Sequence, residues 1–208
     1  TDVCDSNVDL TYVDSDTLND CGLGTVTRTW TATDCKGLTA TASQTITIVD
    51  TTPPAISGVG DDYSVECPTV AVFSTPSATD TCDSDVNLTY VDSDTLNECG
   101  LGTVTRTWTA TNCAGLTATA SQTITIVDTT APVISGVGAN FTVECPTAAV
   151  FSMPSAMDAC NSNVVLSFVD SSSLNNCGLG TVTRTWTATD CSGLTATASQ
   201  TITIEDIT

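Results

Sequence analysis

Acidic side chains are the most abundant groups in this sequence that could do chemistry. The 208 residues include 24 Asp and Glu, four Lys and Arg and no His, which gives a net charge of −20 at pH 7. Clustered carboxylates suit calcium, since this ion prefers about six to eight hard oxygen ligands. The absence of His excludes the Ser-His-Asp and Cys-His catalytic groupings. The residue types therefore favour a cation-binding or structural protein, and no enzymatic activity is expected.

The same charge balance excludes two classes of partner. Nucleic acids and anionic membrane surfaces are bound mainly through Lys and Arg, so neither is expected here. No apolar run approaches the roughly 20 residues of a membrane-spanning helix. Eleven cysteines with only 5% aromatic residues indicate small cores that need disulfides. We therefore expect an extracellular or cell-surface protein without membrane insertion.

The sequence is periodic, and its cysteines recur every 78 residues, as in Cys4, Cys82 and Cys160. Each repeat carries GLGTVTRTWTAT, then GLTATASQTITI, then a link such as VDTTPP or VDTTAP. We place the boundaries at these links. The expected domains are a partial repeat at 1–49 that lacks its first strands, a complete repeat at 50–127, and a complete repeat with the start of the next link at 128–208.

Two long strands are predicted in every repeat. In TVTRTWTAT, threonine alternates with Val26, Arg28, Trp30 and Ala32, and this period of two is typical of a half-buried strand. The segment LTATASQTITI alternates in the same way after a short turn, which predicts an antiparallel hairpin. Shorter strands are expected in PAISGV, DYSVEC, TVAVFS and VNLTYVD. About seven strands in 78 residues indicate an all-β fold of tandem, disulfide-linked immunoglobulin-like antiparallel β-sandwiches.

Geometry selects among the three disulfide pairings that four cysteines allow. Cys99 and Cys113 flank a strand of about ten residues and are about 30 Å apart, too far to bond. If VNLTYVD lies antiparallel to TVTRTWTAT, Cys82 lies beside Cys113, which leaves Cys67 for Cys99. The expected bonds are Cys82–Cys113, Cys67–Cys99, Cys160–Cys191, Cys145–Cys177 and Cys4–Cys35. Cys21 is expected to be unpaired within this sequence.

The stretches VDTTPPAIS, VECP, PSATDTC, TRTWTATDCKG and TATASQTITI resemble the hyalin repeat (HYR) family. Members of this family are immunoglobulin-like modules arrayed in tandem in bacterial and animal extracellular proteins. The likeness spans both complete repeats and the partial one. It implies adhesion or extracellular scaffolding without catalysis. We therefore expect a structural tandem-repeat protein that forms a fibre, stalk or adhesin shaft, and its expected partners are further copies of the repeat in the same or neighbouring chains.

Acidic residues gather where successive repeats are expected to meet, if the chain enters each sandwich at one pole and leaves at the other. Crowded like charges repel one another, and structural Ca²⁺ would neutralise them while stiffening the junction. The alternative is a solvated acidic surface that keeps the protein soluble. The candidate calcium ligands are Asp14, Asp16, Asp20, Asp50, Asp80, Asp83, Asp85, Asp92, Asp94, Asp128 and Asp158.

Glycans are a further possible partner. Asn87 in NLT and Asn140 in NFT are acceptor sequons for N-glycosylation, although such tripeptides also arise by chance. The outward threonine rows could carry O-linked sugars, or they could simply reflect the preference of threonine for pleated strands.

A carbohydrate- or protein-binding adhesion module is the alternative function. Each arginine of the TVTRTWTAT strand, such as Arg106, shares a face with the tryptophan two residues on, such as Trp108. Stacking of the guanidinium on the indole is the structural explanation, and a carbohydrate-binding surface is the functional one. The loop at residues 97–101 is a second candidate binding element. The adjacent acids Asp92 and Asp94 could imitate a glycosidase pair, but carboxylates at strand ends more often simply lie in solvent.

Overall fold

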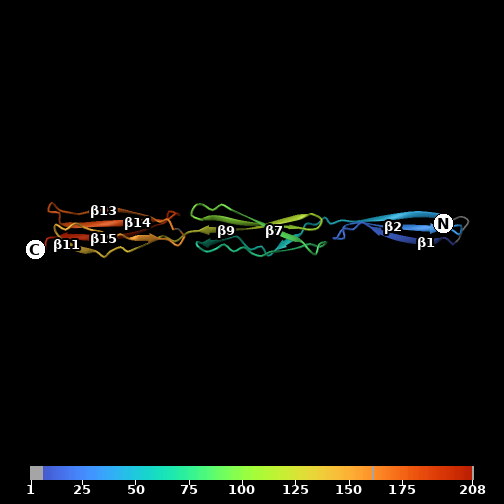
Figure 1. Cartoon of the computed structure of the whole chain (residues 1–208), viewed down its shortest axis with the longest axis horizontal. Coiled ribbons are helices and arrows are strands. Elements are labelled where there is room, and N and C mark those ends of the chain that lie inside the picture. Colours follow the sequence, from blue (N-terminus) through green and yellow to red (C-terminus); the bar gives the residue numbers. More distant parts are fainter. Residues whose placement is uncertain (1–6, 161, 208) are drawn as a thin grey trace. The chain divides into compact units, whose positions relative to one another are not determined.

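The computed structural model describes residues 7–160 and 162–207, and every regular element in them is a β-strand (Figure 1). None of these residues forms a helix with the length and apolar character of a membrane span. The partial repeat contains one antiparallel sheet in the order β1-β2-β3. Its strands are β1 (Asp9–Asp16), β2 (Gly24–Thr33) and β3 (Thr39–Ile48). The expected all-β fold class is confirmed.

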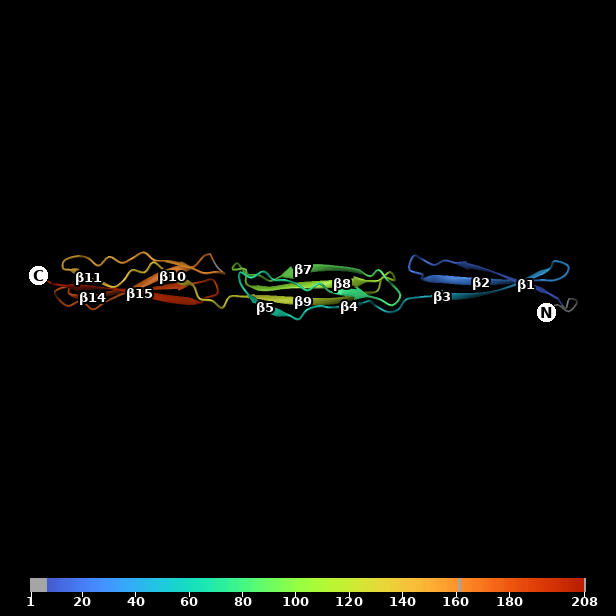
Figure 2. The same cartoon turned by 90° about the horizontal axis from the view of Figure 1, so that it is seen from below.

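The second repeat has a four-stranded sheet, in the order β5-β9-β8-β7, and a two-stranded sheet of β4 and β6. Its strands are β4 (Ala55–Ser57), β5 (Tyr63–Glu66), β6 (Ser77–Thr79), β7 (Asn87–Asp94), β8 (Gly102–Thr111) and β9 (Thr117–Val127). Figure 2 shows β7, β8 and β9 side by side. The strand β5 pairs with β9 in parallel, which is one departure from the expected antiparallel arrangement.

The third repeat has the same topology, with the order β11-β15-β14-β13 in the larger sheet and β10 paired with β12. Its strands are β10 (Val133–Ser135), β11 (Phe141–Glu144), β12 (Ser155–Met157), β13 (Val165–Ser172), β14 (Gly180–Thr189) and β15 (Thr195–Glu205). The strand β11 lies parallel to β15. Repetition of the sequence thus produces repetition of the strand order.

The core of each complete repeat lies on the inward face of the long hairpin. Trp108 is 3% exposed, and Ile124 is fully buried. Gln122 shares this face and is also buried. Its Oε1 accepts a hydrogen bond of 2.9 Å from the backbone N–H of Ser74. A buried amide must find partners, so this glutamine ties β9 to the loop that precedes β6.

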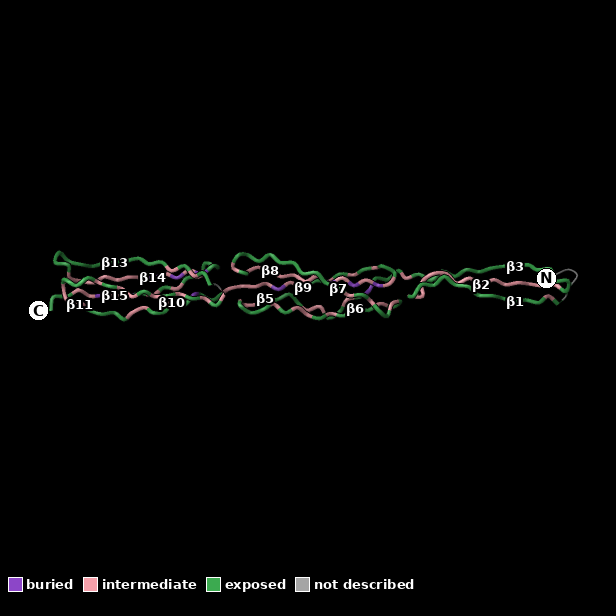
Figure 3. Tube along the Cα trace, in the orientation of Figure 1, coloured by how far each residue is buried: buried purple, intermediate pink, exposed green. Residues whose placement is uncertain are grey.

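The sheet of the partial repeat has the same strands but no buried residue among those described (Figure 3). Ile46 occupies the position of Ile124, 78 residues earlier, and is 57% exposed. In the complete repeats, the segment that contains β4, β5 and β6 precedes the hairpin, and the described residues before β1 include no such strands. The hairpin by itself therefore cannot bury its apolar face.

One expected short strand was wrong, and one short strand was missed. The segment TVAVFS forms no regular strand, and β6 was not predicted. The hydroxyl of Tyr63 donates to the carbonyl oxygen of Val72 at 2.7 Å and accepts from its N–H at 3.2 Å. A side chain therefore supplies hydrogen bonds that a neighbouring strand would otherwise provide, and alternation of residue types cannot reveal this.

The chain groups into two compact units that cut across the repeats. Unit 1 contains Thr1–Gly60, Ser74–Asp92 and Arg106–Gln122, and unit 2 contains Asp61–Phe73, Ser93–Thr105 and Thr123–Thr208. The junction between the partial and second repeats lies within unit 1. The junction between the second and third repeats lies within unit 2.

Candidate functional site: the repeat junctions

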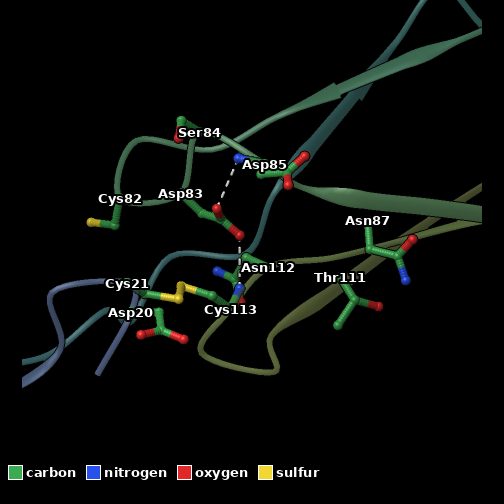
Figure 4. A pocket seen from close by; sticks show the side chains of 10 residues that line it. All are labelled: Asp20, Cys21, Cys82, Asp83, Ser84, Asp85, Asn87, Thr111, Asn112 and Cys113. Atoms are coloured by element: carbon green, nitrogen blue, oxygen red, sulfur yellow. Dashed lines mark hydrogen bonds between the residues drawn. A yellow bond between two sulfur atoms is a disulfide. The ribbon is translucent and has the colours of Figure 1, made fainter. Parts of the chain in front are cut away.

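A disulfide between Cys21 and Cys113 crosses the first junction, with the Cα atoms 6.3 Å apart (Figure 4). Both cysteines sit in turns organised by an asparagine. Asn19 Oδ1 accepts from the N–H groups of Cys21 and Leu23 at 3.0 and 2.9 Å. Asn112 Oδ1 accepts from the N–H of Leu116 at 2.8 Å. The turn between β1 and β2 is therefore bonded to the turn between β8 and β9.

Two disulfides cross the second junction. Cys67 bonds to Cys160 with a Cα separation of 5.2 Å, and Cys99 bonds to Cys191 with a separation of 6.0 Å. The paired residues are 93 and 92 positions apart in sequence. Since this is longer than one repeat, each bond joins neighbouring repeats.

The within-repeat disulfides expected from the sequence are corrected by these bonds. Cys113 and Cys191 do not pair with the expected Cys82 and Cys160, and Cys67 does not pair with Cys99. Cys145 and Cys177 are not joined to each other. Cys21, expected to be unpaired, is bonded. The partner of each bonded cysteine lies in a turn of the neighbouring repeat, which the strand geometry of one repeat does not contain. Cys4, the expected partner of Cys35, lies outside the described residues.

Among the described residues, Cys82, Cys145 and Cys177 carry free thiols. Desolvation and the negative charges of Asp50 and Asp80 raise the pKa of the Cys82 thiol. These carboxylates and the Cys82 sulfur lie within 4.8 Å of one another. Because the thiolate is the reactive form, this environment keeps Cys82 protonated and slow to react.

The link into the third repeat is held by Glu66 at the end of β5. Its carboxylate accepts from the Thr129 N–H at 2.8 Å and from the hydroxyls of Thr129 and Thr130, both at 3.0 Å. These hydrogen bonds, that from the Thr129 N–H first, lower the pKa of Glu66. The side chain therefore fastens the link to the repeat that precedes it.

An open pocket of about 620 Å³ lies beside the Cys21–Cys113 bond (Figure 4). Three predicted calcium ligands, Asp20, Asp83 and Asp85, line it. Asp83 Oδ1 accepts from the N–H of Asp85 at 2.9 Å, and Asp83 Oδ2 accepts from the N–H of Cys113 at 2.8 Å. Both oxygens of Asp83 are thus engaged by backbone donors, which favours a role in shaping the turn.

Asp50 and Asp80, two further predicted ligands, meet around an amide. Asn112 Nδ2 donates to Asp50 Oδ2 at 2.7 Å, to the carbonyl oxygen of Thr52 at 3.2 Å and to Asp80 Oδ2 at 3.4 Å. Asn112 is only 4% exposed. Its NH₂ group therefore occupies the place between the two carboxylates.

Asp128 and Asp158 are the counterparts of Asp50 and Asp80 in the third repeat, and they meet a third carboxylate. One oxygen each from Asp128, Asp158 and Asp190 lies within 4.8 Å of the others. Asp190 replaces the asparagine of the second repeat and is 6% exposed. Asp190 was not predicted from the sequence. The signal that could have found it is the residue immediately before the corresponding cysteine, which changes between repeats: Asp34, Asn112 and Asp190.

The two complete repeats match one sequence family over residues 56–126 and 133–204. That family is the HYR-like domain with 4 cysteines. The chain belongs to this family. The two matched segments are separated by a link that contains Asp128, so the HYR-like repeats are in tandem, as the sequence motifs predict.

Solved structures with some similarity are cadherin ectodomains. The protocadherin gammaB7 EC3-6 cis-dimer structure is 14% identical, with a TM-score of 0.37 over 97% of this chain and 68% of that chain. Protocadherin gamma B2 domains 1-5 give 15% identity and a TM-score of 0.37 over 96% and 53%. The human desmocollin-1 ectodomain gives 12% and 0.30 over 95% and 54%. The chain spans about half of these last two. A search of curated protein sequences found no match.

Asp14 of the first sheet and Asp92 of the first matched HYR-like repeat each bind an arginine. Arg28 donates from Nε and from its terminal nitrogen to the two oxygens of Asp14 at 2.7 and 2.6 Å. Arg106 binds Asp92 in the same way, with both distances 2.7 Å. These hydrogen bonds lower the pKa of each carboxyl. The arginine therefore already satisfies both oxygens of each aspartate.

The arginines stack on rings of the neighbouring edge strand. Arg28 lies 4.1 Å from the ring centre of Tyr12, and Arg106 lies 3.8 Å from that of Tyr90. Arg184 stacks on Phe168 at 3.8 Å. Cross-strand pairing thus supplies an edge-strand ring for each arginine, which the spacing within one strand did not predict.

The eleven predicted calcium ligands thus have different partners. Asp16 and Asp94 are exposed residues at the ends of β1 and β7. Others bind arginine, line the pocket or surround residue 112 or 190. Strand pairing directs Asp14 toward Arg28 of the neighbouring strand, so this carboxylate already has a cationic partner.

The tryptophans and the loop that the sequence suggested for ligand binding are buried or take part in contacts within the fold. Trp108 and Trp186 are each 3% exposed, so they form no surface for a sugar. The loop at residues 97–101 is closed by Asn97 Oδ1, which accepts from the N–H groups of Cys99 and Leu101 at 2.9 and 3.0 Å. This loop forms part of the second junction through Cys99. The sequons at Asn87 and Asn140 are exposed, and glycosylation there stays a prediction.

Proposed function

We propose that this chain is part of an extracellular shaft, in a fibre, stalk or adhesin, whose HYR-like repeats are covalently interlocked. The observation that carries the proposal is that the disulfides join consecutive repeats. Disulfides are stable in oxidising, extracellular surroundings. Adhesive or scaffolding arrays need repeats that stay connected under load, and bonds of this kind supply that connection.

The mechanical consequence follows from the shortest covalent path through the bonded chain. From residue 1 the path runs to Cys21, crosses to Cys113, returns to Cys99, crosses to Cys191 and ends at residue 208. It includes about a quarter of the backbone. Since a fully extended residue spans roughly 3.5 Å, the oxidised chain can be stretched to about 190 Å and the reduced chain to about 730 Å. Unfolding under tension therefore releases little length.

The positions of the free thiols are consistent with disulfides between consecutive repeats. The observed pairs are 92 or 93 residues apart, and the same spacing assigns Cys82 a partner in a preceding repeat. It assigns Cys145 and Cys177 partners in a following repeat. We infer that further copies of the repeat, in the same chain or a neighbouring one, supply these partners. Two disulfides would then cross every junction, as they do between the second and third repeats.

Single-molecule pulling of the oxidised 208-residue chain tests the proposal. We expect a final extension of about 190 Å, and about 730 Å after reduction and alkylation. The double variant Cys99→Ser with Cys191→Ser is the matched control; its shortest path uses Cys67–Cys160 instead and predicts about 400 Å. Full extension of the oxidised wild-type chain to about 400 Å or more would contradict the crossing from Cys99 to Cys191, and bonds confined within repeats also allow that length.

Peptide mapping of the unreduced protein supplies an independent readout. We expect cross-linked peptides that contain Cys21 with Cys113, Cys67 with Cys160 and Cys99 with Cys191.

Binding of Ca²⁺ at the junctions is the second part of the proposal. Asp128 and Asp158 support this part of the proposal best, because Asp190 adds a third carboxylate to them.

A further inference from the structure

The second and third repeats offer a natural comparison at residues 112 and 190. In both repeats Oδ1 of the side chain accepts from the backbone N–H four residues later, at 2.8 Å from Leu116 N to Asn112 and at 2.8 Å from Leu194 N to Asp190. The turn therefore holds both side chains in the same way. Only the second terminal atom differs, an amide nitrogen in one repeat and a carboxylate oxygen in the other.

The neighbouring aspartates are also held alike. Asp50 Oδ1 accepts from the N–H of Thr52 at 2.9 Å, and Asp128 Oδ1 accepts from the N–H of Thr130 at 3.1 Å. Asp80 Oδ1 accepts from the N–H of Cys82 at 2.8 Å, and Asp158 Oδ1 accepts from the N–H of Cys160 at 2.7 Å. Backbone donors thus fix one oxygen of each aspartate in both repeats.

In the second repeat the Nδ2 group of Asn112 supplies positive hydrogen atoms to the space between Asp50 and Asp80. In the third repeat Asp190 places a third carboxylate there. Asp190 is 94% buried, and its Oδ2 has no hydrogen-bond partner within residues 7–160 and 162–207. A buried carboxylate oxygen without a donor, beside two further carboxylates, is unfavourable unless a cation compensates it.

The basic side chains of the protein do not supply that compensation. Arg28, Arg106 and Arg184 are each paired with an aspartate of the adjacent edge strand. Lys36, the remaining basic residue, belongs to the turn between β2 and β3. A side-chain donor at this cluster is Ser192, whose hydroxyl donates to Asp128 Oδ2 at 2.5 Å; it is neutral and contributes no positive charge.

We propose that the third repeat binds one calcium ion between Asp128, Asp158 and Asp190, at the place that an amide NH₂ group fills in the second repeat. Two oxygens on the same calcium ion can be no more than about 5 Å apart, because Ca–O distances are roughly 2.3–2.6 Å. The separations within 4.8 Å meet this limit. The carbonyl of Thr130 corresponds to that of Thr52, which accepts from Asn112, and is a fourth oxygen; water completes the shell.

The location links the ion to both disulfides of the second junction. Asp190 directly precedes Cys191, Asp158 lies two residues before Cys160, and Asp128 lies in the link itself. Binding by these three residues would tie the link to the two loops that carry the disulfides. Stiffening of the junction by this ion rests on the proposed shaft function, whereas the binding itself does not.

Calorimetric titration of the oxidised, calcium-free 208-residue chain with CaCl₂ tests the site. Asp190→Asn copies the residue of the second repeat, and we expect it to lose one bound calcium or to weaken binding at least about tenfold, because calcium affinity follows the ligand charge. Asn112→Asp, the matched converse, should gain one calcium relative to wild type. The Ser192→Ala variant tests the Asp128 contact and should keep the calcium.

Thermal unfolding with calcium and with chelator supplies the second readout. We expect calcium to raise the midpoint of the wild type and to have less effect on Asp190→Asn. Equal stoichiometry, affinity and midpoint shift in these two proteins would overturn the site. The disulfide map and the pulling lengths do not depend on calcium, so a negative titration would leave the interlocked shaft standing.

Discussion

Asn112 and Asp190 occupy the same turn in successive repeats and accept the same backbone hydrogen bond, yet one donates to two aspartates and the other adds a third carboxylate to them. The shared turn shows that the fold tolerates either residue. The difference therefore concerns local charge more than architecture.

Stability in the presence of chelator should reflect that difference. We expect Asp190→Asn to raise the free energy of unfolding by about 1–3 kcal/mol, since an unsatisfied buried acceptor is replaced by a donor. Asn112→Asp should lower it by a similar amount. Chemical denaturation of both variants and the wild type in chelator measures this; a loss of stability in Asp190→Asn would contradict it.

Substitutions in the apolar face of a hairpin should lower stability only where the strands that precede that hairpin are present. Ile124 and Ile202 are fully buried, so Ile→Val at either should cost about 0.5–1.5 kcal/mol. Ile46, at the same position of the partial repeat, is 57% exposed. Ile46→Val should change stability by no more than about 0.5 kcal/mol. Equal costs at Ile46 and Ile124, measured by denaturant unfolding, would show that the first hairpin is covered.

The link at Glu66 should weaken in acid. Hydrogen bonds from Thr129 and Thr130 lower the pKa of Glu66 in the folded state. Its contribution to stability is therefore present above the unfolded pKa, about 4.3, and is lost as pH falls through the lower folded value. The matched variant Glu66→Gln should flatten this part of the pH profile. A Glu66 carboxyl that titrates at or above about 4.3 in an NMR experiment would refute the prediction.

The thiols should differ in reactivity. Cys82 has a raised pKa from desolvation and from Asp50 and Asp80, and fewer thiolates mean slower alkylation. We expect iodoacetamide at neutral pH to label Cys177, which is exposed, faster than Cys82. Replacement of both aspartates by asparagine should accelerate labelling of Cys82. Mass spectrometry of partly labelled protein gives both rates, and a Cys82 rate unchanged by the double substitution would count against the electrostatic explanation.

The arginine pairs could have been anticipated from strand register. Asp14 and Arg28 are directly opposite in the β1–β2 ladder, as are Asp170 and Arg184 in β13–β14. An alignment of VNLTYVD against TVTRTWTAT in antiparallel register places these charges together. Reading Asp14 only as part of an acidic cluster missed the pair, because composition does not indicate the partner on the next strand.

The sequence by itself determined the 78-residue period, the long hairpin and the inward positions of Trp108 and Ile124, because alternation within one strand is a local property. It also carried the family resemblance that the matched segments bear out. It could not determine the partners of the cysteines or the division of the acidic residues into groups. Those depend on which turns of one repeat meet the turns of the next, and only the tertiary structure brings Cys21 to Cys113 and Asp190 to Asp128.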